Sequence, residues 1–252
     1  MVVNMNIIEI KNLNFKYDNK TIFKNLNLNI KKNSFITILG SNGSGKSTLA
    51  RLITSKHKNI LIKEESIGYI SSNPDEQIVG TTVKEQLTFY LKQQNLTNNQ
   101  IRIRLSKIIK EFSLEPIINQ DPYSLENDEK QLIILLSNII SEFKIIVLDD
   151  ALSLISSSNK DKLLKYLKKK KRTIINITND TEECIYGTDV AIINKNIVLN
   201  KPLKEALNEE KIFIDNSLKL PFMAELSLKL KYYNLLDELK LDIDEMVKQI
   251  WN

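Results

Sequence analysis

The residues best suited to chemistry form a glycine-rich segment that follows a short apolar run. The segment consists of Gly40, Ser41, Asn42, Gly43, Ser44, Gly45, Lys46, Ser47 and Thr48. Residues 35–39 before it are mostly apolar, and residues 48–53 after it have a helical pattern. A strand, a glycine-rich loop and a helix in this order are the context of a phosphate-binding loop. We therefore predict that this segment binds a nucleoside triphosphate.

Each residue type in this loop has a physical task. The three glycines allow backbone conformations in which successive N–H groups converge on phosphate oxygens. The N-terminus of the following helix adds unpaired donors and the positive end of its dipole. Lys46 is expected to contact the β- and γ-phosphates, and Ser47 is expected to coordinate Mg²⁺. A turn that merely connects a strand to a helix is the alternative, and the complete set of residues argues against it.

A second candidate group follows the apolar run at residues 144–148. This run is expected to form a buried strand that ends in Asp149, the arrangement that a Walker B element requires. An aspartate at this point can hold the Mg²⁺ that bridges the phosphates, because hard cations prefer oxygen ligands. A surface aspartate after a core strand is the alternative. Together the two groups predict ATP and Mg²⁺ as cofactors.

Composition places the chain among ordinary globular proteins. It has 252 residues, 42% hydrophobic and 27% charged, with a net charge of +5. Cys184 is its only cysteine, so an internal disulfide is impossible and a reducing cytosol fits. Residues 1–6 lack the features of a signal peptide, and no apolar stretch approaches the ~20 residues needed to span a bilayer. The basic run at residues 168–172 favours a solvated helix end over contact with nucleic acid or anionic lipid.

Hydrophobic periodicity outlines the elements that must position these groups. Alternation in residues 7–17 and 21–30 predicts an antiparallel strand pair. Residues 54–70 read as a short excursion ending in a strand at 66–70. Helical patterns cover 82–118 and 130–140, whereas strands are expected at 144–148, 173–178, 190–193 and 197–199. Strands that return after helices indicate a largely parallel α/β sheet covered on both faces.

Three regions follow from this pattern. We expect an ATP-binding domain at residues 1–200, a helical subdomain at about 80–143 within it, and a helical C-terminal extension at 201–252. The extension has apolar residues at helical spacing, namely Leu226, Leu228, Leu230, Leu235, Leu236 and Leu239. Packing against the body of the protein and a partner-binding helix remain equal alternatives for it.

Over nearly its whole length the chain resembles the ATP-binding subunits of ABC transporters. The resemblance implies a P-loop NTPase fold, with a RecA-like core, an antiparallel β subdomain and an α-helical subdomain, followed by the short helical tail. It also implies that Tyr17 stacks on adenine. Asn73-Pro74-Asp75-Glu76-Gln77, with residues 81–83 after it, is most similar to the form found in energy-coupling factor (ECF) importers of vitamins and metal ions. Leu220-Pro221-Phe222 resembles the tail of the same ATPases.

The departures from this family fall on catalytic positions. Asp150 stands where the family has a catalytic glutamate, which shortens the side chain by one methylene; a displacement of ~1 Å can cost on the order of 100-fold in rate. Asn179 aligns with the switch histidine and lacks its positive charge. Ser72 aligns with the Q-loop glutamine, and Ser156 with the D-loop aspartate.

The signature motif is the most altered element. The family has Leu-Ser-Gly-Gly-Gln, whereas this chain has Leu125, Glu126, Asn127, Asp128 and Glu129. Loss of both glycines removes the close backbone approach to the γ-phosphate of a partner subunit, and three carboxylates would face a polyanion. Acids in a first turn also stabilise a helix dipole, so a helix start freed from catalysis is the alternative. Both interpretations predict an impaired signature.

These observations predict an ATP-binding subunit of an ECF-type importer with slow turnover of its own. The resemblance implies three partners, which are a second ABC ATPase, a transmembrane coupling subunit and a membrane substrate-binding subunit. The chain would then lie peripherally on the cytoplasmic side of the cell membrane, and no nucleic-acid partner is expected. A non-hydrolysing nucleotide-gated subunit and a soluble non-transport ABC ATPase are the alternatives; the ECF-like tail argues against the latter.

Overall fold

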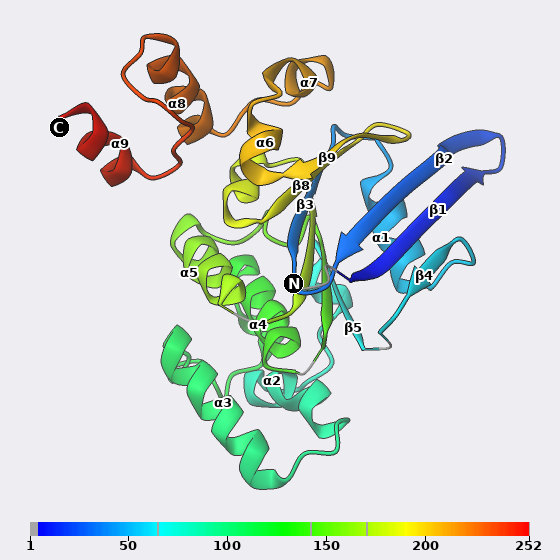
Figure 1. Cartoon of the computed structure of the whole chain (residues 1–252). Helices are drawn as coiled ribbons and strands as arrows, with labels where there is room; N and C mark the ends of the chain where they lie inside the picture. The colour runs from blue at the N-terminus through cyan, green and yellow to red at the C-terminus, as the bar shows by residue number, and fades with distance from the viewer. Residues whose placement is uncertain (1–4, 65, 142, 170, 252) are drawn as a thin grey trace. The chain divides into compact units, whose positions relative to one another are not determined.

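A computed structural model describes residues 5–64, 66–141, 143–169 and 171–251 (Figure 1). The chain divides into two compact units, which are described separately. The first comprises Met1–Lys63 and Ile175–Asn252, and the second comprises Glu64–Ile174. Residues 1–4 of the expected non-signal start, and Lys170 of the basic run, lie outside the described residues. The domain limits expected from the sequence stay predictions.

A three-stranded antiparallel sheet forms one part of the first unit. Its order is β2 (Lys20–Lys31), β1 (Asn6–Tyr17), β4 (Ile60–Ile62). The predicted antiparallel pairing is confirmed by the register, in which Ile10 lies opposite Leu28 and Phe15 opposite Phe23. The short strand β4 pairs with β1 inside the segment that the sequence pattern left as an excursion.

The first unit contains a second set of strands, one of which leads into the phosphate loop. Strand β3 (Phe35–Leu39) is buried along its whole length and pairs in parallel with β8 (Asp189–Ile193). Strand β8 pairs antiparallel with β9 (Ile197–Pro202). Helix α1 (Lys46–Thr54) begins within the loop segment, directly after Gly45. The strand, loop and helix order expected from the sequence is therefore confirmed.

The C-terminal extension packs into the core of the first unit. It forms α6 (Leu203–Leu207), α7 (Glu210–Asp215), α8 (Phe222–Tyr232) and α9 (Ile243–Ile250), labelled in Figure 1. One hydrophobic cluster joins apolar residues of this extension to those of β3, β8 and β9; it includes Leu39, Val190, Leu199, Phe213, Leu220, Ala224 and Leu239. Packing is thus shown for part of the extension. Ile243, Val247 and Trp251 of the last helical segment are exposed.

The helical interpretation of Leu235, Leu236 and Leu239 is wrong. Helix α8 ends at Tyr232, and Asn234 has a φ of 57°, a left-handed conformation that a helix interior does not contain. Leu236 and Leu239 are nevertheless buried, so their spacing reflects a loop that packs on the core. The backbone N–H of Lys240 donates to Ser227 Oγ at 2.8 Å and holds this loop on α8.

The second unit combines two parallel strands with helices. Strand β5 (Ile67–Ser71) pairs with β6 (Ile145–Asp149). The helices are α2 (Val83–Lys92), α3 (Asn98–Phe112), α4 (Asn127–Ile140) and α5 (Ser157–Lys168), with single 3₁₀ turns at Pro74–Glu76 and Pro122–Ser124. The helical prediction for 82–118 is confirmed as two helices up to Phe112, but it is wrong for residues 113–118, since Ser113 has a left-handed backbone and ends α3. The helix predicted from Lys130 begins earlier, at Asn127, because two glutamates cap it there.

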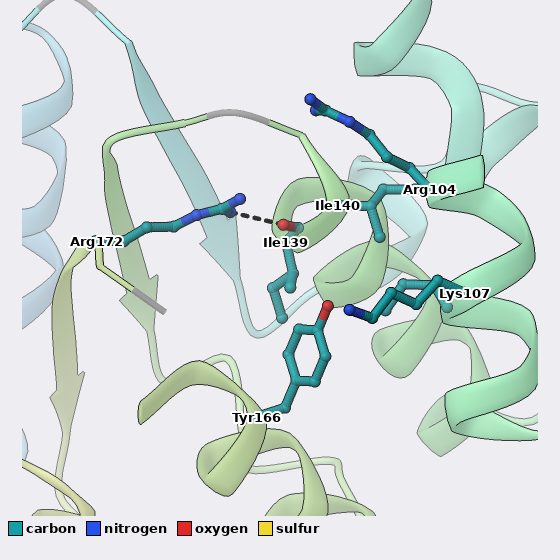
Figure 2. A pocket seen from close by; sticks show the side chains of 7 residues that line it. Arg104, Lys107, Ile139, Ile140, Tyr166 and Arg172 are labelled. Carbon is teal, nitrogen blue, oxygen red and sulfur yellow. Dashed lines mark hydrogen bonds between the residues drawn. The ribbon is translucent and has the colours of Figure 1, made fainter. Parts of the chain in front are cut away.

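The basic run behaves as a solvated helix end where it is described. Lys168 ends α5, and it and Lys169 are exposed. Nearby, a pocket of about 280 Å³ in the second unit is lined by Arg104, Lys107, Ile108, Ile139, Ile140, Tyr166 and Arg172 (Figure 2). The guanidinium of Arg172 donates to Ile139 O at 2.6 Å, and this bond satisfies a carbonyl in the last turn of α4. Burial raises the pKa of the Tyr166 phenol.

No helix among the described residues combines the length and the hydropathy that crossing a bilayer requires.

Candidate nucleotide-binding site

The phosphate loop has the backbone conformation that its glycines allow. Gly43 and Gly45 have φ angles of 80° and 105°, in the left-handed region that other residues rarely adopt. A Cβ at Gly45 would lie 2.5 Å from the ring of Phe23. Gly40 differs, because its φ is not positive; a Cβ there would lie 2.4 Å from Ser44 Oγ and 2.8 Å from Ile193 O. Gly40 therefore serves close packing rather than the backbone conformation expected from the sequence.

The ammonium group of Lys46 contacts backbone carbonyl oxygens of the phosphate loop. Lys46 is only 6% exposed, and its Nζ donates to Gly40 O at 2.9 Å and to Ser41 O at 3.3 Å. An ammonium group held by the loop's own carbonyl oxygens lies beside the backbone N–H groups that bind phosphate in such loops. This geometry fits the predicted contact with a polyanion.

Asn179, the residue aligned with the switch histidine, lies beside the phosphate loop. It follows strand β7 (Thr173–Thr178), and its Nδ2 donates to Asn42 Oδ1 at 3.3 Å. The structure thus brings together two predicted site residues that are 137 positions apart in the chain. The contact is made through an uncharged amide, which can donate a hydrogen bond but supplies no positive charge.

Tyr17 lies at the end of β1 with much of its ring exposed. The rings of Tyr17 and Phe15 pack edge to face, with a centroid distance of 5.0 Å and an interplanar angle of 89°. An exposed aromatic ring that is supported from one side suits stacking on a planar base.

Asp149 is a buried carboxylate in the second unit. It is 5% exposed, and its Oδ2 accepts a hydrogen bond from the phenolic hydroxyl of Tyr69 at 3.0 Å. Tyr69 was not among the residues expected to form the site. Its place in strand β5 is evident from the sequence, but the contact depends on the register between two strands 80 positions apart.

Asp150 has a left-handed backbone conformation, with a φ of 49°. Its carbonyl oxygen accepts hydrogen bonds from the backbone N–H of Ser153 at 3.2 Å and from Ser153 Oγ at 2.8 Å. A tight turn therefore follows strand β6 and fixes the backbone of this residue. Aspartate tolerates the left-handed region better than most residues.

Two glutamines hold the end of strand β5 next to Ser72. Gln77 of the Asn-Pro-Asp-Glu-Gln segment accepts from Ser71 N and donates to Tyr69 O, both at 3.1 Å. Gln131 is fully buried and donates to Ser71 O and Ala151 O, both at 2.9 Å. Gln131 thus ties the residue before Ser72 to the residue after Asp150. A role for Gln131 could not be predicted from the sequence, because nothing in the local pattern shows which carbonyls it meets.

The altered signature segment, residues 125–129, caps the N-terminus of helix α4. Glu126 is the N-cap of α4, and its side chain accepts from Glu129 N while Glu129 Oε2 accepts from Glu126 N at 3.3 Å. Such a reciprocal capping box satisfies donors at a helix N-terminus. Asp128 Oδ1 in turn accepts from Ser156 N at 3.2 Å. The side chains of Glu126 and Glu129 therefore engage two of the backbone donors at this end of α4.

The predicted site residues are divided between the two units. The phosphate loop, Tyr17 and Asn179 belong to the first, whereas Ser72, Asp149, Asp150 and the signature segment belong to the second. The hydroxyl of Ser47 and the carboxylate of Asp149 are hard oxygen donors, which is the ligand type that Mg²⁺ prefers. Each unit by itself therefore offers an oxygen donor of the kind that suits a magnesium ion.

A match to a family model shows which family the chain belongs to. The family model described as "ABC transporter" matches residues 23–153, which include the phosphate loop, the signature segment and Asp149. The chain belongs to the ABC transporter family. ATPases of this family use ATP with Mg²⁺, so the cofactors expected from the two motifs are those of the family.

Curated relatives of this ABC ATPase extend the match to the tail. The "Energy-coupling factor transporter ATP-binding protein EcfA1" of Mycoplasmopsis synoviae (strain 53) is 28% identical, over 97% of this chain and 99% of the relative. The protein of that name from Ligilactobacillus salivarius (strain UCC118) is 32% identical, over 89% of this chain and 88% of the relative.

Solved structures confirm the ABC ATPase fold. The cbiO1 protein of Clostridium perfringens, described as part of the ABC transporter complex cbiONQ, matches with a TM-score of 0.70 at 24% identity over 88% of this chain and 98% of that chain. The ATP-binding cassette MJ0796 matches with a TM-score of 0.67 at 22% identity, over 78% and 98%. The predicted ABC ATPase fold is thereby confirmed.

Proposed function

We propose that this chain is the ATP-binding subunit of an ECF-type importer for vitamins or metal ions. Similarity to ECF ATP-binding proteins over nearly all of both chains supports the assignment. The observation that carries ATP binding is the phosphate loop, in which Gly43 and Gly45 have left-handed backbones and Lys46 lies buried against the loop carbonyls. ATP binding and hydrolysis would drive transport by opening and closing an ATPase dimer.

Within this proposal the site residues have separate roles. Tyr17 stacks on adenine, residues 40–48 bind the phosphates, and Ser47 and Asp149 hold Mg²⁺, which neutralises charge on the phosphates. Asp150 takes the position of the base that activates water, and Asn179 and Ser72 take the positions of groups that place the γ-phosphate and the water.

Slow turnover by this chain is part of the proposal. Asp150 has a shorter side chain than the family's glutamate, and Asn179 reaches the phosphate loop without a positive charge. A non-hydrolysing, nucleotide-gated subunit of the same complex is the second candidate. The replacements at Asp150 and Asn179 favour it, because they fall on the groups proposed to activate water and to contact the γ-phosphate in this chain's own site.

The similarity to ECF ATPases also supports a proposal for how this chain assembles with other subunits. The chain pairs head-to-tail with a second ABC ATPase that has an intact signature, and binds a transmembrane coupling subunit and a membrane substrate-binding subunit. It thereby lies on the cytoplasmic side of the cell membrane. Co-expression with the membrane subunits encoded by neighbouring genes tests this assembly. If this chain is an importer subunit, it should copurify with them in detergent. Purification of the chain without them, in a complex with ribosomes, would support the soluble alternative.

Nucleotide binding is tested by calorimetry with the purified chain. Lys46→Ala should lower the affinity for Mg-ATP at least several-fold, because it removes a charge-assisted contact to the phosphates. Lys58→Ala is the matched control, since Lys58 is an exposed lysine of the same unit. Equal affinities of the parent and Lys46→Ala, or no binding by the parent, would contradict the proposed role of the loop.

A further inference from the structure

The two strands of the second unit place a tyrosine on the same face as the metal-ligand aspartate. Strands β5 and β6 are parallel, with Tyr69 opposite Val147 and Ser71 opposite Asp149. Side chains alternate between the faces of a strand, so Tyr69 and Asp149 point to one face and are diagonal neighbours. A tyrosine side chain is long enough to cover such a diagonal, and its hydroxyl meets Asp149 Oδ2 at 3.0 Å.

The backbone of Tyr69 is held independently of this contact. Gln77 Nε2 donates to Tyr69 O, and Gln77 Oε1 accepts from Ser71 N, each at 3.1 Å. One side-chain amide therefore grips the strand on both sides of Ile70. The phenol extends from a fixed strand through only two torsions, so its hydroxyl has little freedom to leave the carboxylate.

We propose that Tyr69 is a positioning residue for Asp149 as a ligand of the nucleotide-bound metal ion. The inference rests on the proposed function, in which Asp149 holds Mg²⁺. A carboxylate that ligates a metal is itself oriented by hydrogen bonds from neighbouring groups, and loss of such a partner typically costs 10–100-fold in metal affinity. The Tyr69 hydroxyl supplies this bond to Oδ2 and fixes the plane of a carboxylate that is 5% exposed.

The chemistry of the bond suits this role. A phenol donates one hydrogen bond and carries no charge at neutral pH, so it orients the aspartate without neutralising it. Ser72, three residues further along the chain, stands where the family's glutamine helps to place the metal and water. In a chain that lacks this glutamine, Tyr69 thus supports the metal ion indirectly, by holding the ligand Asp149 from strand β5. Tyr69→Phe removes only the donor and preserves the ring, so it isolates this contribution.

The test measures Mn²⁺ binding to the protein–ATP complex by electron paramagnetic resonance. Tyr69→Phe should weaken Mn²⁺ binding about 10-fold. It should leave unchanged the affinity for ATP in EDTA, which depends on the phosphate loop. Tyr90→Phe is the control, because it removes a phenol hydroxyl from a half-buried tyrosine of the same unit, whose ring packs on Phe89 and Phe143. This control should bind Mn²⁺ as the parent does.

A double-mutant cycle with Asp149→Asn completes the test. Once the carboxylate is gone, Tyr69→Phe should cause no further loss of Mn²⁺ affinity, since coupled residues are not additive. Equal or tighter Mn²⁺ binding by Tyr69→Phe would overturn the inference and leave the proposed function standing. A parallel loss of ATP affinity in EDTA would make Tyr69 merely structural and also overturn it. Failure of the parent to bind Mn²⁺ with ATP would instead overturn the proposed function.

Discussion

At the scale of single residues, the backbone of Asp150 favours an aspartate at the position proposed for the catalytic base. Its φ of 49° lies in the left-handed region, which costs most residues roughly 1–2 kcal/mol and aspartate or asparagine less. The short side chains of these two residues bond locally to the backbone. Glutamate lacks this advantage, so the shorter acid suits the turn after β6 even though it displaces the carboxylate.

Substitution at Asp150 should therefore separate stability from chemistry. We expect Asp150→Glu to lower the free energy of unfolding by about 1 kcal/mol and Asp150→Asn to leave it nearly unchanged. Urea denaturation followed by circular dichroism measures both. Asp244→Glu, in the first turn of α9, serves as the control because its backbone is helical. Equal stability of Asp150→Glu and the parent would show that the backbone conformation is not what favours aspartate.

Cys184 gives a second prediction at this scale, one that depends on pH. The thiol is fully buried; burial, then the charges of Glu182 and Asp180, raise its pKa to about 12. Since the thiolate is the nucleophile, iodoacetamide at pH 8 should label the native protein at least on the order of 100-fold more slowly than the urea-unfolded chain. Mass spectrometry of timed samples measures the rates.

The sign of the stability effect follows from the same pKa shift. Above about pH 8.5 the unfolded chain loses a thiol proton that the folded protein keeps, so the free energy of unfolding falls as pH rises towards 12. A Cys184→Ala variant should lack this component of the pH dependence. Native labelling at the rate of the unfolded chain would show that the thiol is accessible.

At the scale of elements, the start of α4 has become a structural cap. Glu126 and Glu129 satisfy each other's backbone donors, as serine and glutamate do in an ordinary capping box. Glu126→Ala should lower the free energy of unfolding by about 1 kcal/mol, whereas Glu126→Ser should retain most of it, because serine is also a good cap. Urea denaturation checks this. Glu115→Ala, at an exposed loop position, is the control, and equal losses for alanine and serine would refute the capping role.

Some of the elements could be predicted from local sequence patterns, whereas others depend on tertiary contacts. The phosphate loop and strands β1 and β2 follow from local patterns, because a contiguous motif and a period of two need no tertiary information. Strand β4 has three residues, too few for a period. Leu236 and Leu239 have helical spacing but pack from a loop, and Asn234 was the signal that the helix had ended. The bonds of Tyr69 and Gln131 depend on strand register and buried carbonyls, which no local pattern contains.

At the scale of the whole assembly, the altered residues fall in both sites of the proposed head-to-tail dimer. One site would contain Lys46, Asp149, Asp150 and Asn179 of this chain with the partner's signature. The other would contain the partner's phosphate loop with residues 125–129 of this chain. Under the proposal, the first would keep its grip on the phosphates but would lack a well-placed base and a charged switch. The second would keep the partner's base but would meet the capped start of α4.

Most hydrolysis should therefore occur at the partner's phosphate loop, because a misplaced catalytic water is harder to rescue than a loosened clamp. Inactivating the partner's base should nearly abolish ATPase activity of the reconstituted complex. Restoring Asp150→Glu with Asn179→His in this chain should raise total activity only modestly, since Ser72 and Ser156 stay altered and the glutamate must adopt a left-handed backbone. Steady-state ATPase measurements decide between the sites. Substantial turnover after inactivation of the partner would show that Asp150 is a competent base and would reverse this ranking.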